Sequence, residues 1–289
     1  MPTEPIQQIL AAFEITLLLI GVWLVGRFAL NAPFRARWWS TNQLPPWSVA
    51  LAEFALYLFV LFSGSFIMQG TLGVLLGKII AKAPDRLGLE MIVYTGAGLD
   101  GGAILGWLLF PFLRRAWLAD YGATPDPEPP VKPRLPWTKV LLYAGAVVAV
   151  ALPVLSVVSL GWTFALKQAG LPDDLQESIA IFSNTKSPWV VAGMLLSACV
   201  LAPLMEELLF RAGIYRYCRQ HLGRSPALLI SGVIFGAIHL NWAGFIPLAV
   251  LGMMLALVYE ATGSIRVAIL AHAFFNLNNI VAILSGLTT

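Results

Sequence analysis

Two adjacent carboxylates and an arginine lie inside an apolar run near the end of the chain. In APLMEELLFRAG (202–213) they are Glu206, Glu207 and Arg211. A charged side chain at the centre of a membrane helix costs roughly 2.5–3.5 kcal/mol on insertion scales, so three of them need an explanation. In a helix, Glu207 and Arg211 share a face and can pair, whereas Glu206 lies about 100° further round. We therefore expect one carboxylate neutralised by the arginine and a second one that points elsewhere.

Two further polar pairs follow, each separated by four positions. They are Phe235 with His239 in GVIFGAIHLN and His272 with Asn276 in ILAHAFFNLNN. A single His or Asn in a membrane helix is commonly an interhelical hydrogen-bonding contact. Three polar pairs within one third of the chain instead indicate a functional cluster that faces the bundle interior or a water-filled cavity. The third histidine, His221, lies in a basic stretch and is expected to be a solvated loop residue.

The chemistry that these residue types could perform is hydrolysis. A desolvated glutamate can act as a general base near neutral pH, so Glu206 with His239 could hold and deprotonate a water molecule. The His272 ring and the Asn276 amide are suitable hydrogen-bond donors to an oxyanion that develops on a carbonyl. No serine or cysteine accompanies the histidines in a recognisable nucleophile motif, which disfavours a covalent mechanism.

A metal ion is the alternative way to activate the water. The zinc-binding pattern H-E-x-x-H is absent, although Glu206, His239 and His272 together would be a chemically reasonable zinc set. No two of these three share a helix at the i, i+4 spacing, and Asn276 beside His272 suits oxyanion binding better than coordination. We expect catalysis without a metal cofactor and keep zinc as the alternative.

Composition requires that these motifs lie in a membrane. Hydrophobic residues make up 58% of the 289 residues, charged residues only 11%, and the mean hydropathy is +0.80. A soluble domain carries about 25% charged residues, so we expect an integral protein of the lipid bilayer. The net charge of +3 gives no support for a nucleic-acid partner. Cys199 and Cys218 form neither a disulfide framework nor a thiolate metal site. The N-terminus lacks a basic region, so it is expected to be a retained first span.

Apolar runs of about 20 residues predict an all-α polytopic protein with about eight transmembrane helices. The expected spans are 8–30, 47–69, 91–113, 140–166, 189–210, 226–240, 244–262 and 267–287. The sixth is short, and residues 71–80 could form a separate interfacial helix. The proline-rich stretch 120–137 predicts an extended linker. It divides an N-terminal three-helix region with its linker (1–139), whose role the sequence does not indicate, from a five-helix region (140–289).

The distribution of basic residues predicts the orientation. Most Lys and Arg flank the first, third, fifth and seventh loops, so these loops are expected to be cytoplasmic and both termini outside. Isolated acids in the spans, namely Glu14, Glu53, Asp100 and Glu260, are expected to be structural. Gly263 suits a helix C-cap and Ser264 the N-cap of the last helix.

The three motifs, read as EELLFR, FGAIH and YEATGSIRVAILAHAFFN, resemble those of the type II CAAX prenyl endopeptidases and their prokaryotic relatives, the CPBP or abortive-infection intramembrane proteases. The resemblance covers about residues 189–287. It implies that Glu206 is the catalytic base and that His239 helps to hold the water. It also implies that Glu207, Arg211 and Phe235 organise the site, and that His272 and Asn276 stabilise the oxyanion.

The same resemblance bears on substrate and location. Eukaryotic members cleave the last three residues after a prenylated cysteine, whereas prokaryotic members are linked to peptide maturation or bacteriocin self-immunity. We therefore expect an intramembrane endopeptidase of a prokaryotic cell membrane, acting on a peptide or protein whose C-terminus could be prenylated. A non-catalytic immunity or scaffold protein on the same fold is the first alternative. A proton-coupled transporter is the second, although the sequence shows none of the internal repeats expected of one.

Overall fold

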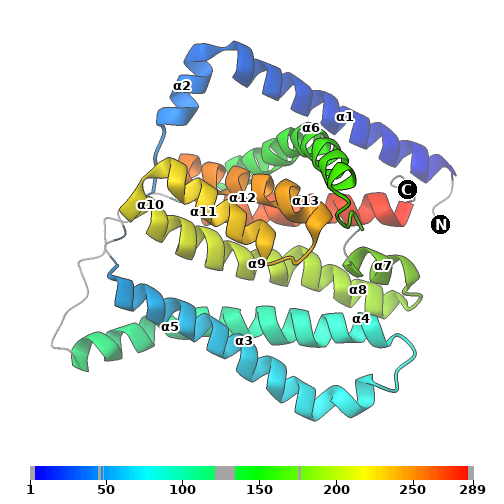
Figure 1. The fold of residues 1–289 in the computed structure, drawn as a ribbon, viewed down its shortest axis with the longest axis vertical. Coiled ribbons are helices and arrows are strands. Elements are labelled where there is room, and N and C mark those ends of the chain that lie inside the picture. Colours follow the sequence, from blue (N-terminus) through cyan, green and yellow to red (C-terminus); the bar gives the residue numbers. More distant parts are fainter. Residues whose placement is uncertain (1–3, 45–46, 48, 121–133, 175–176, 286–289) are drawn as a thin grey trace. The chain divides into compact units, whose positions relative to one another are not determined.

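The computed structural model describes residues 4–44, 47, 49–120, 134–174 and 177–285, which contain helices and no strands. The helices of the N-terminal half are α1 (Glu4–Leu30), α2 (Ala32–Ser40), α3 (Leu51–Ile80), α4 (Arg86–Glu90), the π-helix η1 (Met91–Asp100), α5 (Gly101–Asp120) and α6 (Trp137–Ala169). Those that follow are α7 (Glu177–Asn184), α8 (Pro188–Leu196), η2 (Ser197–Leu201), α9 (Ala202–Glu207), η3 (Leu208–Tyr215), α10 (Arg216–Leu222), α11 (Arg224–Ala237), α12 (Trp242–Thr262) and α13 (Ile265–Ser285). Figure 1 shows these elements along the chain.

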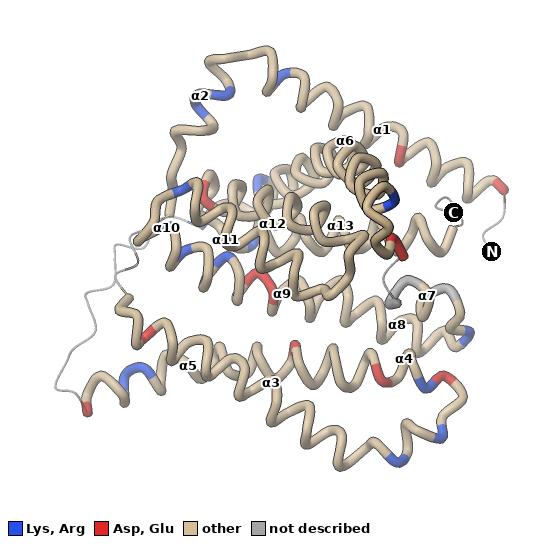
Figure 2. The backbone as a smooth tube through the Cα atoms, viewed as in Figure 1, with Lys and Arg blue, Asp and Glu red and all other residues tan. Residues whose placement is uncertain are grey.

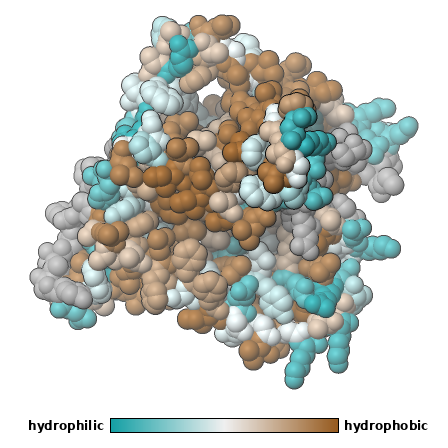
Figure 3. All heavy atoms as spheres, in the orientation of Figure 1, coloured by the Kyte–Doolittle hydropathy of each residue, from teal (hydrophilic) through white to brown (hydrophobic). Residues whose placement is uncertain are grey.

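Seven of the described helical segments are long and apolar enough to cross a bilayer. The expected sixth span corresponds to α11, which has 14 residues and is shorter than the other apolar helices, as the sequence indicated. Figure 2 shows long parts of these helices without charge, and Figure 3 shows that much of the visible surface is hydrophobic. The chain is therefore an all-α, multi-pass membrane protein.

Two details of the helix assignment differ from expectation. Residues 71–80 do not form a separate interfacial helix, because α3 continues unbroken to Ile80. The fifth span extends well beyond residue 210, since helical turns run without interruption from Pro188 to Leu222. The expected extended linker falls mainly on 121–133, outside the described residues.

The chain forms two compact units that do not follow the sequence division at residue 139. Unit 1 contains Met1–Leu44, Arg134–Ser183 and Leu222–Thr289, and unit 2 contains Pro45–Pro133 and Asn184–His221. The difference arises because α1 packs along α6, while η1 packs against η2 in the other unit. Each unit is described by itself below.

In unit 1, α6 is the helix around which the others pack. It contacts α1, α12 and α13, and α11 lies along α12. A buried cluster of small and aliphatic side chains fills this centre: Ala144, Ala151, Leu155, Leu251, Leu255 and Ala271. Small residues also let α11 and α12 approach closely, since a Cβ atom on Gly236 would lie 2.4 Å from the Phe245 carbonyl oxygen.

In unit 2, α3 and α5 lie side by side through glycines on facing surfaces (Figure 1). A Cβ on Gly64 would lie 2.3 Å from the Gly102 carbonyl oxygen, and a Cβ on Gly106 would lie 2.5 Å from the Val60 carbonyl oxygen. Backbones this close leave no room for a methyl group. Small residues at helix contacts are a common way of packing helices in membranes.

This contact predicts that Gly64→Ala destabilises the protein by about 1–3 kcal/mol, because the added methyl group forces α3 and α5 apart. Gly73→Ala is the matched control on the same helix, since nothing lies within 4 Å of a Cβ there. It should be neutral or stabilising by up to about 1 kcal/mol, the gain of alanine over glycine in a helix. Unfolding in detergent micelles measures both variants, and equal stabilities would contradict the described packing.

Candidate active site

The first motif lies in a helix that changes its winding around it. Glu206 and Glu207 are in the short α-helix α9, with the π-helix η2 before it and the π-helix η3 after it. A π-helix bonds residue i to i+5 and is frequent at functional sites. Pro203 stands at the start of α9, directly after η2.

Glu207 and Arg211 form a buried ion pair. An Nη1 atom of Arg211 lies 2.7 Å from Oε1 of Glu207, and both side chains are 0% exposed. The pairing expected from the four-residue spacing is therefore present, although Arg211 is in a π-helical segment. The neighbouring Glu206 is only half-buried. The two adjacent carboxylates thus have different surroundings.

Asp100 is a further carboxylate of this unit, which the sequence did not connect with the motif. It ends η1, is 4% exposed, and its Oδ2 atom has no hydrogen-bond partner among the described residues. Asp100 also lies close enough to Glu206 for their charges to interact. The segments η1 and α5, which meet at Asp100, both contact α9.

The packing around Asp100 explains why this carboxylate is held in place. A Cβ on Gly96 would lie 2.2 Å from Oγ of Ser197, so η1 and η2 touch at a glycine. On the other side, the Ser65 hydroxyl donates to the Leu99 carbonyl oxygen at 2.8 Å. Asp100 was expected to be structural, as an acid near a helix end. Its position within the apolar run GAGLDGGAILGW is the sequence feature that marks it as an ionisable residue of the membrane interior.

The other three acids that were predicted to be structural, Glu53, Glu260 and Glu14, do not share the surroundings of Asp100. Glu53 pairs with Arg114, and Glu260, 1% exposed, pairs with Arg224 at 2.9 Å. These partners account for both groups. Glu14 lines an apolar cavity of about 320 Å³ together with residues of α6 and α13.

The second motif lies at the end of its helix rather than inside it. The expected span 226–240 is wrong at its end, because α11 stops at Ala237 and His239 lies in the following turn. Nδ1 of His239 is 2.8 Å from the Phe235 carbonyl oxygen. A carbonyl oxygen only accepts, so this contact is a hydrogen bond when Nδ1 carries the proton. A neutral ring in this tautomer presents the lone pair of Nε2 to a further donor.

Phe235 brings the two histidine motifs together. Its ring is fully buried, with its centroid 5.1 Å from that of His239 and 5.7 Å from that of His272. Both contacts are edge-to-face, a favourable geometry for aromatic pairs. His272 is 4% exposed on α13, and Asn276, one turn further along, is half-buried. His221 is exposed as expected, but it lies in the last turn of α10 rather than in a loop.

The expected site residues thus form two clusters, one in each unit. Glu206, Glu207 and Arg211 belong to unit 2, as does Asp100, and Phe235, His239, His272 and Asn276 belong to unit 1. The candidate zinc ligands come from both units. Within neither unit do the described His, Cys, Asp and Glu side chains form a group of three around a metal position.

Comparison with known families confirms the resemblance carried by the motifs. Residues 188–278 match the family model described as "Type II CAAX prenyl endopeptidase Rce1-like". This range contains all seven residues of the three motifs. Asp100 lies outside it, in the part of the chain to which the match does not extend.

One curated relative is a Bacillus subtilis (strain 168) protein named "Putative membrane peptidase YdiL". It is 31% identical over 83 residues, which cover 29% of this chain and 34% of the relative. The chain therefore aligns with about a third of that protein's length. No solved structure matches the chain.

The buried ion pair predicts a large and specific loss of stability. Arg211→Ala would leave the Glu207 carboxylate buried without its charge partner, a change that typically costs 3–5 kcal/mol. Replacing both residues by apolar ones, as in the double variant Glu207→Leu with Arg211→Met, should cost clearly less than Arg211→Ala, because no charge is then stranded. Unfolding in micelles compares the three proteins. A double variant at least as unstable as Arg211→Ala would contradict the assignment.

Proposed function

We propose that this membrane protein is an intramembrane endopeptidase, similar to the CAAX prenyl proteases, that hydrolyses a peptide bond with a water molecule activated by Glu206. The observation that carries the proposal is the buried pair of Glu207 with Arg211. It pairs one of the two adjacent carboxylates with the arginine in the protein interior, whereas the other, Glu206, is half-buried. The match of residues 188–278 to the CAAX endopeptidase model supports the reaction class.

In the proposed reaction, Glu206 takes a proton from water as the resulting hydroxide attacks the scissile carbonyl carbon. A tetrahedral oxyanion forms. When it collapses, the carbon–nitrogen bond breaks and protonated Glu206 returns its proton to the leaving amine. The products are a carboxylic acid and an amine, Glu206 is regenerated, and the acid then loses its proton to the amine or to solvent. A half-buried carboxylate suits this role, because it can be reached by water while part of its hydration shell is removed.

His239 is proposed to orient the attacking water. With Nδ1–H directed to the Phe235 carbonyl oxygen, the ring is held in one tautomer and Nε2 can accept a hydrogen bond from that water. His272 and Asn276 would then donate to the oxyanion. Phe235, in contact with both rings, would fix their orientation relative to each other.

The proposed substrates are peptides or proteins with or without a prenyl group, so the test uses several substrates. Purified protein in vesicles is offered farnesylated and unmodified C-terminal peptides, and internal peptides of the same length. We expect cleavage of at least one class. Glu206→Gln should reduce kcat by at least about 100-fold, as removal of a general base typically does, with unfolding unchanged.

Glu14→Gln, remote in sequence from the motifs and outside the matched range, serves as the matched carboxyl-to-amide control and should keep its rate. If the wild-type protein cleaves no peptide while Glu206→Gln leaves a cellular phenotype intact, a non-catalytic immunity or scaffold role replaces the protease. The same assay after chelator treatment tests the proposed independence of metal. Loss of activity that zinc restores, with stoichiometric zinc in the active protein, would replace the metal-free mechanism.

Asp100 is proposed to position Glu206 through their electrostatic contact. Glu207, next to Glu206 in the chain, pairs with Arg211. Asp100→Asn removes a carboxylate beside the base while keeping its shape.

We therefore expect Asp100→Asn to lower kcat while KM and the free energy of unfolding stay unchanged. Asp120→Asn at the exposed end of α5 is the control and should keep the wild-type kcat. A fall in kcat accompanied by an equal loss of folded protein would show that Asp100 acts on folding alone.

A further inference from the structure

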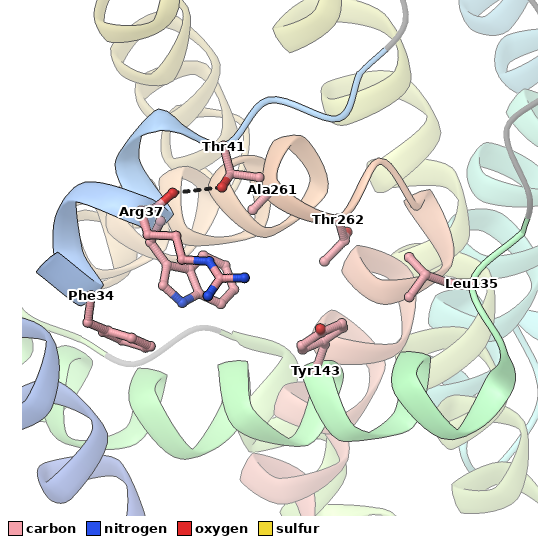
Figure 4. Close-up of a pocket in the computed structure, with 8 residues that line it drawn as sticks. Phe34, Arg37, Thr41, Leu135, Tyr143, Ala261 and Thr262 are labelled. Atoms are coloured by element: carbon pink, nitrogen blue, oxygen red, sulfur yellow. Dashed lines mark hydrogen bonds between the residues drawn. The ribbon is translucent and has the colours of Figure 1, made fainter.

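Unit 1 contains a half-open pocket that none of the motifs uses, here called the α2 pocket (Figure 4). Its volume is about 320 Å³, within the size range of small-molecule sites. Its walls come from α2 and the residue after it, from the beginning of α6, and from the end of α12. The lining residues are Phe34, Arg37, Trp38, Thr41, Leu135, Tyr143, Ala261 and Thr262.

Three arginines around the pocket are engaged in holding its walls. Arg224 donates to the Thr41 carbonyl oxygen at 2.8 Å, and also pairs with Glu260. Arg266 donates to the Leu135 carbonyl oxygen at 2.7 Å. Arg35 donates to the Ala29 carbonyl oxygen at 2.6 Å, which fixes the turn between α1 and α2. These contacts make the pocket a built feature of the fold rather than a gap between mobile ends.

Arg37 differs from these three arginines. Its guanidinium has no hydrogen-bond acceptor or ion-pair partner among the residues that the structure describes, while its carbonyl oxygen accepts from Thr41 Oγ1 at 2.7 Å (Figure 4). In the close-up, the Arg37 side chain extends from α2 toward α6, and Tyr143 extends from α6 toward it. Glu260 cannot compete for Arg37, because Arg224 holds its carboxylate.

Basic side chains outnumber acidic ones at the helix ends that form and surround the α2 pocket, which favours an anionic ligand. They are Arg27, Arg35, Arg37, Lys139, Arg224 and Arg266 against Glu260. The planar guanidinium group can donate two parallel hydrogen bonds, a geometry that fits a phosphate or a carboxylate. The pocket also lies where a spanning helix gives way to a short helix rich in tryptophan, the composition of a membrane interface.

We propose that the α2 pocket binds the phosphate-bearing headgroup of an anionic phospholipid, with Arg37 as its charge partner. The Tyr143 hydroxyl can donate a second hydrogen bond. Phe34, Trp38 and Leu135 provide apolar walls for the glycerol and first methylenes, which a free phosphate ion would leave uncovered. Basic pockets between membrane helices are known to select such headgroups. This proposal is independent of the proposed peptidase activity.

The experiment measures lipid retention by the full-length protein. Wild-type and variant proteins are equilibrated in nanodiscs containing phosphatidylglycerol and phosphatidylcholine, then released for native mass spectrometry. Wild type should retain phosphatidylglycerol preferentially. Arg37→Gln should lower its apparent affinity about tenfold, the loss expected for a charge-assisted contact. Tyr143→Phe should lower it less.

Lys139→Gln is the matched control, since it removes the same charge from an exposed position on the same face that does not line the pocket. It should retain phosphatidylglycerol as wild type does. Equal loss in Arg37→Gln and Lys139→Gln would overturn the proposal and leave only general attraction to an anionic surface. Displacement of the lipid by millimolar inorganic phosphate would likewise overturn it in favour of a small-anion site. If Arg37→Gln does not fold, Arg37→Lys replaces it, because lysine keeps the charge but lacks the planar guanidinium group. Arg37→Lys must then retain less phosphatidylglycerol than Lys139→Gln does.

Discussion

The buried contact between Glu207 and Arg211 is the interaction that constrains unit 2 most. Removing two charges from water costs several kcal/mol per ion, and their attraction offsets this only if both stay close and further hydrogen bonds are made. The helix that carries them must therefore be covered by protein at this depth. Phe210 and Tyr215 on the same helix are 0% exposed, and Tyr57 from α3 donates to the Leu208 carbonyl oxygen at 2.7 Å. The position of α3 is thus tied to the pair.

The same constraint accounts for the placing of other charges. Glu53 with Arg114 and Glu260 with Arg224 are each two residues from different helices, so each pair joins segments far apart in the chain. Between such pairs the helices are held by small residues and aliphatic side chains, because lipid gives no hydrophobic reason for helices to associate. Close glycine contacts, as between Gly64 and Gly102, supply the remaining contact area.

Sequence reasoning found the spans and the ion pair because both depend on local rules. Apolar length identifies a membrane helix, and a four-residue spacing identifies a pair on one helix face. The cap at Gly263 was found in the same way, since its φ of 64° lies in the left-handed region that glycine tolerates. The prediction of an all-α, multi-pass membrane protein therefore followed from the sequence.

What sequence reasoning missed depends on contacts between distant segments or on competition between helix ends. His239 falls outside α11 because the Asn241 side chain caps the next helix, accepting from the Gly244 amide at 2.7 Å. The link between the two helices needs Leu240 in the left-handed region, with φ of 49°, which no residue pattern signals for a leucine. The closeness of Asp100 to Glu206 and the make-up of the two compact units likewise depend on contacts between segments far apart in the chain.

The π-helical segments have a consequence for how this chain can change in evolution. Each closes its hydrogen-bonded ring over one residue more than an α-helix does. Loss of a single residue from η2 would convert that turn to an α-helix by removing the extra residue that the wider ring accommodates. The residues that follow, Glu207 among them, would keep their faces, whereas the same loss from an ordinary α-helix turns every later residue by about 100°. A deletion that would misdirect the side chains of most helices is therefore one that this helix can absorb.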